Sequence, residues 1–212
     1  MLVSHWRTLS VTSLTTVALL LAAPQLEAGL VIVEPDDFAA GTNISNAFAG
    51  VTLSAVGTQT GGVDVFSVAG PHASTGSFVF GHDPTVLDPF DWTRLFDYAQ
   101  LKATFYKPTD FVSIDIVGLN STSSFFSGRL QAFNSSGTSL EIASANALLF
   151  AGDVKTIAIH RPQQDIAYVL ASGDTDFNSL DNLQFSAVPE PSSLALLGIG
   201  CAAIAVRRRR RR

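Results

Sequence analysis

Cysteine is almost absent from this chain. The 212 residues include one, Cys201, which lies in an apolar run near the C-terminus. No internal disulfide is therefore available to the segment before it, even in an oxidising compartment. Cys201 itself is expected to act as a small apolar residue. The folded part must owe its stability to a hydrophobic core, with a metal ion as a further candidate.

Basic residues are scarce between Gly29 and Ala187. This segment has six Lys and Arg against sixteen Asp and Glu, a net charge of −10, and the C-terminal arginines bring the whole chain to −5. Proteins bind nucleic acid largely by neutralising phosphates with Lys and Arg. We therefore predict no nucleic-acid partner, whereas cation binding and solubility outside the cell are compatible with this charge.

Signatures of catalysis are also missing. The spacing of His72, His82 and His160 does not resemble that of a zinc site. No nucleophile motif is present, and the acidic residues are too numerous to single out a glycosidase pair. The sequence therefore predicts a protein that is not an enzyme, with a glycan-acting enzyme as a minor alternative.

No apolar run is as long as an ordinary transmembrane helix, but each end of the chain carries a shorter one. At the N-terminus, Arg7 precedes an uncharged run over Leu9–Ala23. Ala28, followed by Gly29, ends an acceptable cleavage site, and cleavage after residue 22 or 23 is the alternative. We predict a helical signal peptide over residues 1–28 and export through the inner membrane.

The C-terminal end has three parts in a fixed order. Pro189, Glu190 and Pro191 come first, an uncharged run over Leu194–Val206 follows, and six arginines, Arg207–Arg212, come last. Each proline keeps the residue before it extended, which is the form that proteases grip. The apolar run spans only about 20 Å as a helix, so a transmembrane helix over 192–206 needs help from its flanks. The arginine tail over 207–212 stays on the cytoplasmic side and leaves the globular part outside.

This order of parts resembles the PEP-CTERM sorting signal of exported bacterial proteins. The resemblance covers residues 188–212, and the matching motif residues are Pro189, Glu190 and Pro191. It implies recognition and removal of the tail by a membrane processing enzyme of the exosortase type. It also suggests exopolysaccharide or biofilm biology. An ordinary C-terminal membrane anchor with a proline-rich linker is the alternative.

The interior, residues 29–187, reads as one all-β domain. Short segments rich in Val, Ile, Phe and Tyr alternate with clusters of Ser, Thr and Gly. Val112, Ile114 and Ile116 alternate with polar residues, as in a half-buried antiparallel strand. A turn over 134–137 predicts a hairpin over 129–142. Many short strands at regular spacing predict a single antiparallel β-sandwich. The expected strands are 30–34, 51–56, 63–68, 77–80, 101–106, 111–117, 129–133, 139–142, 154–160, 166–171 and 181–185.

A second resemblance concerns the two ends of this interior. Glu34–Phe38 and Phe48–Leu53 look like the start of the jelly-roll domains found in exported PEP-CTERM proteins. Ile166–Val169 and Leu180–Phe185 look like the last two strands of such domains. They are similar to galactose-binding and carbohydrate-binding jelly rolls, so the resemblance implies a jelly-roll-like sandwich.

Asp181 is an unusual residue for its place in the last expected strand. It shares a face with the apolar Leu183 and Phe185, and a buried carboxylate needs a partner. In jelly rolls of this kind the first and last strands tend to be neighbours, and many hold a structural calcium near their ends. The candidate calcium ligands are Glu34, Asp36, Asp37 and Asp181. Alternatively, Asp181 bonds backbone amides and the acids at 36 and 37 make a turn.

An aromatic segment over 82–98 is a candidate ligand site. Phe90 and Trp92 could stack on a sugar while Asp91 accepts its hydroxyls. The alternative, which we favour, is that these rings plug one end of the sandwich.

Taken as a whole, the sequence predicts a non-catalytic surface or extracellular-matrix protein. It would be anchored transiently in the membrane by its C-terminal helix and then reside at the cell surface or outside the cell. Its expected partners are an exosortase-type enzyme and exopolysaccharide or surface proteins. A carbohydrate-binding module built on the Trp92 loop is the alternative.

Overall fold

A computed structural model of the protein describes residues 29–57, 60, 63–83, 89–92, 98–119, 127–146, 150–173 and 178–187. The predicted signal peptide over 1–28, the predicted transmembrane helix over 192–206 and the arginine tail lie outside these residues. Among the residues that are described, no helix is long and apolar enough to cross a membrane.

The described chain is made almost entirely of β-strands. One short 3₁₀ helix, η1 (Pro35–Asp37), follows the first strand. Each segment that the sequence predicted as a strand overlaps an observed strand, with ends that differ by a few residues in most cases. The strands are β1 (Gly29–Val33), β2 (Val51–Val56), β3 (Phe66–Ala69), β4 (Phe78–Gly81), β5 (Gln100–Thr109), β6 (Phe111–Gly118), β7 (Ser127–Phe133), β8 (Ser139–Asn146), β9 (Val154–His160), β10 (Ile166–Gly173) and β11 (Asn178–Ala187).

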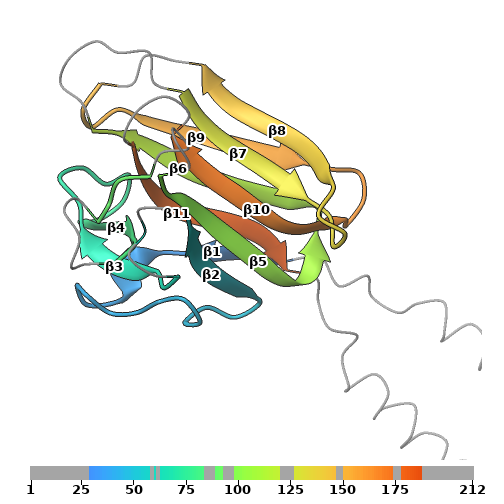
Figure 1. Cartoon of the computed structure of the whole chain (residues 1–212), viewed down its shortest axis with the longest axis horizontal. Helices are drawn as coiled ribbons and strands as arrows, with labels where there is room; N and C mark the ends of the chain where they lie inside the picture. Colours follow the sequence, from blue (N-terminus) through green and yellow to red (C-terminus); the bar gives the residue numbers. More distant parts are fainter. Residues whose placement is uncertain are drawn as a thin grey trace, which may run out of the picture.

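The strands form two antiparallel sheets that pack face to face (Figure 1). One sheet has the order β3-β4-β11-β6-β9, with β1 also paired to β11. The other sheet has the order β2-β5-β10-β7-β8, and its β5, β10, β7 and β8 lie nearest the viewer in Figure 1. The predicted all-β, jelly-roll-like antiparallel sandwich is therefore confirmed.

The core lies between the sheets because the strands alternate in hydrophobicity. In β2, Val51, Leu53 and Ala55 are buried, whereas the residues between them are partly exposed. Successive side chains of a strand point to opposite faces, so this alternation directs one face inward. The largest fully buried side chains are Trp92, Phe80, Ile44, Leu53, Leu101, Ile114, Ile116, Leu130, Ile159, Ile166 and Leu180.

Strand β6 departs from the predicted half-buried pattern. Val112, Ile114 and Ile116 are buried as expected, but Ser113 and Asp115 on the other face are buried as well. The strand lies inside its sheet, between β11 and β9. The Asp115 carboxylate accepts hydrogen bonds from side chains of both neighbouring strands, at 2.6 and 3.0 Å. The prediction of a solvated polar face for this strand was therefore wrong.

The predicted hairpin between β7 and β8 is confirmed. The Asn134 side-chain oxygen accepts hydrogen bonds from the backbone N–H groups of Ser136 and Thr138, at 3.1 and 2.9 Å. Gly137 has φ of +81°, which glycine adopts without strain. Side-chain capping and this glycine together set the tight connection.

The two ends of the described chain lie side by side. β1 and β11 pair in register from Gly29 opposite Ala187 to Val33 opposite Leu183. The first and last strands are thus neighbours, as the jelly-roll resemblance implied.

Candidate functional site

Three carboxylates approach one another where β1 ends. Glu34 follows β1, Asp36 lies in η1, and Asp181 comes from β11, the strand that pairs with β1. The loop between β3 and β4 folds over them and supplies Ser74 and Thr75. Distant parts of the sequence therefore form a single acidic cluster, which we define as Glu34, Asp36 and Asp181.

Asp181 is the buried centre of this cluster, with 0% exposure. Its Oδ2 accepts hydrogen bonds from the backbone N–H and hydroxyl of Ser74, both at 2.9 Å, and from the backbone N–H of Thr75 at 3.1 Å. Its Oδ1 accepts from the backbone N–H of Asn182 at 2.9 Å. Asn182 has a positive φ of 46°, at the irregularity in the β11–β6 pairing. The buried carboxylate thus has partners within the protein, as a buried charge requires.

Asp36 holds the other side of the same loop. Its Oδ1 accepts hydrogen bonds from the backbone N–H groups of Ser77 and Phe78, at 2.8 and 3.2 Å. Gly76, between the two halves of the loop, has φ of +47°, and a Cβ there would collide with the Asp36 carboxylate. The loop can close over the cluster because this position is glycine.

Glu34 is the member of the cluster whose ionised form is the least favoured. Burial and the nearby negative charge of Asp181 raise the pKa of Glu34 from 4.5 to about 7. Burial also raises the pKa of Asp181, although its hydrogen-bond donors oppose this shift. Among the described residues, Glu34 Oε1 and Asp36 Oδ2 are buried oxygens without a hydrogen-bond partner. Two carboxylates this close are most stable when one of them holds a proton.

These residues do not fit the predicted calcium. Calcium takes six to eight oxygen ligands. The oxygens of Asp181 accept bonds from N–H and O–H groups, and Asp37 is exposed to solvent. Within the described parts of the chain, no group of three or more His, Cys, Asp or Glu is placed to hold a metal ion. The structure therefore favours the alternative in which Asp181 bonds the backbone.

The residues of the aromatic segment that the structure describes, 82–83, 89–92 and 98, lie in the core or against it. Trp92 is 0% exposed, and its indole N–H donates to the Phe80 carbonyl at 2.8 Å. The His82 ring meets it edge-on, with ring centroids 5.3 Å apart, and burial lowers the pKa of His82. Asp91 is buried and Phe90 is half-buried. Trp92 therefore has no exposed ring face to offer a sugar, and a binding site cannot use it as a stacking platform.

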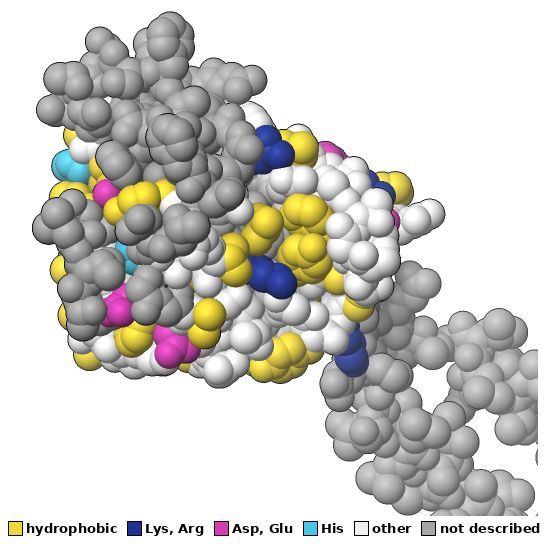
Figure 2. Space-filling model, viewed as in Figure 1, with side chains coloured by type: hydrophobic (Ala, Val, Ile, Leu, Met, Phe, Trp, Pro, Cys, Tyr) yellow, Lys and Arg dark blue, Asp and Glu magenta, His cyan; other side chains and the backbone are white. Residues whose placement is uncertain are grey.

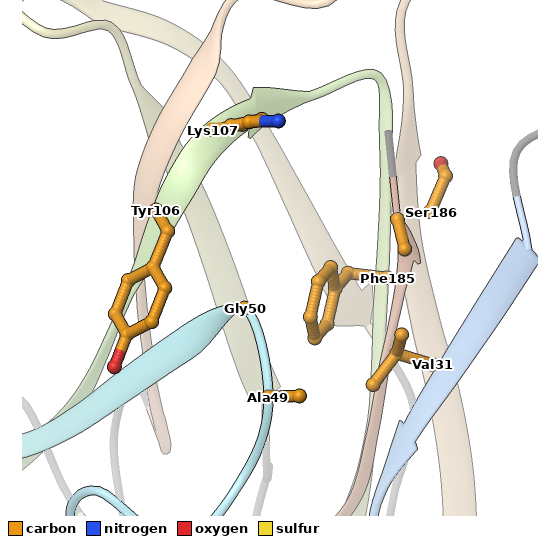
Figure 3. A pocket seen from close by; sticks show the side chains of 8 residues that line it. Val31, Ala49, Gly50, Tyr106, Lys107, Phe185 and Ser186 are labelled. Atoms are coloured by element: carbon orange, nitrogen blue, oxygen red, sulfur yellow. The ribbon is translucent and has the colours of Figure 1, made fainter. Parts of the chain in front are cut away.

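An apolar pocket lies at the end of the molecule where β11 finishes. Its volume is about 240 Å³, and Figure 3 shows Phe185 between Tyr106 on one side and Val31 on the other. Ala49 and Gly50 close its base in that view, and Ala187 also lines it. The pocket therefore borders the point at which the chain leaves the described domain.

The outer face of the β2-β5-β10-β7-β8 sheet carries an ordered group that sequence reasoning missed. The rings of Phe133 and Tyr168 stack with centroids 4.7 Å apart and an angle of 6°. The Lys102 ammonium lies 4.5 Å from the centre of the Tyr168 ring. We call Lys102, Arg129, Gln131, Phe133 and Tyr168 the sheet-face cluster. The strand pattern places each of them outward, but the sequence does not reveal which strands are neighbours.

Residues 187–211 match the family model of the PEP-CTERM protein-sorting motif. The chain carries a PEP-CTERM sorting signal. This confirms the sorting signal that was predicted from Pro189, Glu190 and Pro191. The PEP-CTERM signal marks an exported protein that is sorted through its C-terminal end, and it implies processing by an exosortase-type enzyme. The match begins at Ala187, the last residue of β11.

No curated protein matches the chain. Among solved structures, it is similar to the C-terminal family 22 carbohydrate-binding module of Clostridium thermocellum Xyn10B, with 12% identity and a TM-score of 0.38. That match covers 71% of this chain and 94% of the module. The K2 cleaved adhesin domain of Lys-gingipain is 12% identical with a TM-score of 0.40, over 74% of this chain and 99% of that domain. Similarities this low say nothing about what the PEP-CTERM protein binds.

Proposed function

We propose that this chain is a non-catalytic surface or extracellular-matrix protein that is processed at its C-terminal sorting signal and associates with exopolysaccharide. The observation that carries the proposal is the PEP-CTERM motif over 187–211. Pro189, Glu190 and Pro191 come just after the end of β11, so cleavage at or beyond this motif leaves every described strand intact.

The order of events follows from the chemistry of the two ends. The signal peptide over 1–28 directs export and is cleaved before Gly29. The apolar segment over 192–206 then holds the protein in the membrane, and the arginines over 207–212 keep its tail on the cytoplasmic side. An exosortase-type enzyme recognises Pro189, Glu190 and Pro191 and removes the tail. The domain then stays at the cell surface or outside the cell.

The pairing of β1 with β11 supports this proposal. Gly29 and Ala187 are opposite each other in the sheet, so both cleavage points lie next to strands held by backbone hydrogen bonds. The Pro-Glu-Pro motif follows this paired edge directly in the sequence, and its prolines favour the extended form that a membrane enzyme can grip.

Carbohydrate binding is a second candidate function, and the sheet-face cluster favours it. Phe133, Tyr168 and Lys102 lie on an outer sheet face, whereas Trp92 lies in the core. A glycan-binding role would therefore use this face in place of the aromatic segment around Trp92.

Intact mass of the protein from a host with its processing enzyme tests the sorting proposal. We expect the wild type to lose both residues 1–28 and the arginine tail. The Pro189→Ala/Pro191→Ala variant should lose the first segment and keep the tail. Pro162→Ala changes an exposed proline in a loop of the domain and should be processed like the wild type. A wild-type chain that still ends in the arginines would make the protein a tail-anchored membrane protein instead.

A further inference from the structure

We propose that the outer face of the β2-β5-β10-β7-β8 sheet binds an anionic polysaccharide, with Lys102 and Arg129 contacting its acidic groups. The inference rests on the proposed association with exopolysaccharide and names the site and the class of glycan. It follows from the arrangement of side chains across the strands, from the distribution of charge and from the partners of the two cations.

The register of the strands places these side chains in rows across the sheet. Leu170 of β10 is opposite both Lys102 of β5 and Gln131 of β7. In the next row, Tyr168 of β10 is opposite both Thr104 of β5 and Phe133 of β7. Residues two apart on a strand share a face, so the two rows form one continuous surface.

Positive charge collects on this sheet although the domain is acidic. The five strands contain Lys102, Lys107 and Arg129 but only one acidic residue, Glu141. The segment 29–187 as a whole has sixteen acidic residues against six basic ones. In Figure 2, which views this side, hydrophobic side chains gather around a basic one, and the visible acidic side chains lie away from them. This local charge complements an anionic ligand, whereas the rest of the domain repels one.

The two cations of the cluster have no acidic partner in the described parts of the chain. Among the described residues, no ion pair joins Lys102 or Arg129 to a carboxylate, whereas Arg161 pairs with Asp165 at 2.6 Å. Arg129 Nη2 donates to the Gln131 side-chain oxygen at 2.8 Å, and its Nε is buried without a hydrogen-bond partner in the described structure. The neighbour holds the guanidinium in place without neutralising its charge, so its remaining N–H groups can contact an acidic group of a ligand.

Aromatic packing fixes the position of the Lys102 ammonium. The Tyr168 ring lies between Phe133 on one side and Lys102 on the other. Contact with an aromatic face holds a cation without neutralising its charge. The Lys102 ammonium therefore keeps a defined place above the sheet while it remains able to bind an anion.

The remaining side chains on this face favour a glycan over other polyanions. Ser54 is opposite Lys102 in the first row, and Thr52 is opposite Thr104 in the second. Hydroxyl groups can donate to and accept from sugar hydroxyls along an extended chain. Nucleic acid is disfavoured because the domain as a whole is strongly negative.

Binding to polygalacturonate tests this inference, with the full-length chain kept in a mild detergent and Arg207–Arg212 replaced by serine in every protein compared, because six arginines would bind any polyanion. Fully methyl-esterified polygalacturonate has the same backbone without the charge and serves as the matched ligand. We expect at least 10-fold tighter binding to the charged form, with affinity falling as NaCl is raised. The Lys102→Gln/Arg129→Gln double variant should lose this preference by about 10-fold or more. Lys155→Gln removes an exposed cation from β9 of the other sheet and should change the affinity less than 2-fold.

Thermal unfolding of each variant confirms that it is folded before its binding is compared. Equal binding of the two ligand forms, or an unchanged affinity in the double variant, would overturn the anionic-glycan site and leave the proposed sorting function standing. Tighter binding to single-stranded DNA than to polygalacturonate would also overturn it. Failure of both polysaccharides and of a neutral glucan to bind would remove the exopolysaccharide part of the proposed function as well, while the processing test by mass stays independent.

Discussion

Replacing Glu34 with Gln should make the protein more stable at alkaline pH. In the acidic cluster, burial and Asp181 raise the pKa of Glu34 from 4.5 to about 7. The folded state therefore binds this proton more tightly than the unfolded chain. Its contribution to stability is fully present below pH 4.5 and is lost as the pH rises through about 7. Glutamine keeps the size of the side chain and cannot ionise, so the variant should not lose this contribution.

The magnitude follows from the size of the shift. Each pKa unit corresponds to about 1.4 kcal/mol, which sets an upper bound of about 3 kcal/mol for Glu34. Because the side chain is only partly buried, screening by water reduces the expected effect to about 1–2 kcal/mol. At pH 8 the Glu34→Gln variant should exceed the wild type in unfolding free energy by this amount, and at pH 4.5 the advantage should disappear.

Urea unfolding of both proteins between pH 4.5 and pH 8 measures this difference. Comparing them at each pH cancels His82, whose lowered pKa changes stability in the opposite sense. Asp37→Asn changes an exposed neighbouring residue and should not raise the unfolding free energy at pH 8 relative to the wild type. The reasoning fails if the wild type is the more stable protein at pH 8, above all if EDTA abolishes that advantage. Such a result would mean that a cation, and not a proton, neutralises the cluster.

The remaining predictions concern the packing of the domain. Asp181→Ala should cost about 3 kcal/mol in urea unfolding, because it leaves several buried N–H and O–H donors without their acceptor. Gly76→Ala should destabilise the domain by more than Gly41→Ala in the same assay, since a Cβ at Gly76 meets Asp36 whereas one at Gly41 meets nothing within 4 Å; equal losses would contradict the close contact. Trp92→Ala should cost about 3–5 kcal/mol and lower the melting temperature, and a loss below 1 kcal/mol would show that the ring is not buried.

The fold could be predicted from local patterns because the sequence of most strands identifies them by itself. β2 and β9 have the predicted ends, since apolar alternation and flanking turns mark them clearly. β11 begins at Asn178, three residues before the predicted start, because Asn178 and Ser179 join the sheet by pairing with β6. Neither residue favours a strand by itself. Strand ends of this kind depend on the partner strand, which the local sequence does not contain.

The candidate sites were harder to predict because they join distant residues. The face of Asp181 was predicted wrongly: Asp181 is opposite Asp115, whereas Phe185 is opposite Val112 of the core face, because the bulge at Asn182 shifts the alternation. The partners of Asp181, Ser74 and Thr75, are more than 100 positions away in the chain. Lys102 and Tyr168 likewise meet only because β5 pairs with β10. The calcium prediction counted carboxylates and could not anticipate that backbone amides would satisfy Asp181.

The position of the two ends on paired strands also determines how the domain responds to force. Pulling Gly29 and Ala187 apart would load the outermost pair of β1 and β11 first, so the strands would unzip one pair at a time. Antiparallel hydrogen bonds run perpendicular to the strands and resist this direction one after another, not together. Under the proposed processing, loss of the N-terminal segment would leave only Ala187 and whatever holds the opposite sheet as points where force enters. The load would then cross the packed core, so this cleavage would remove the mechanically weak direction.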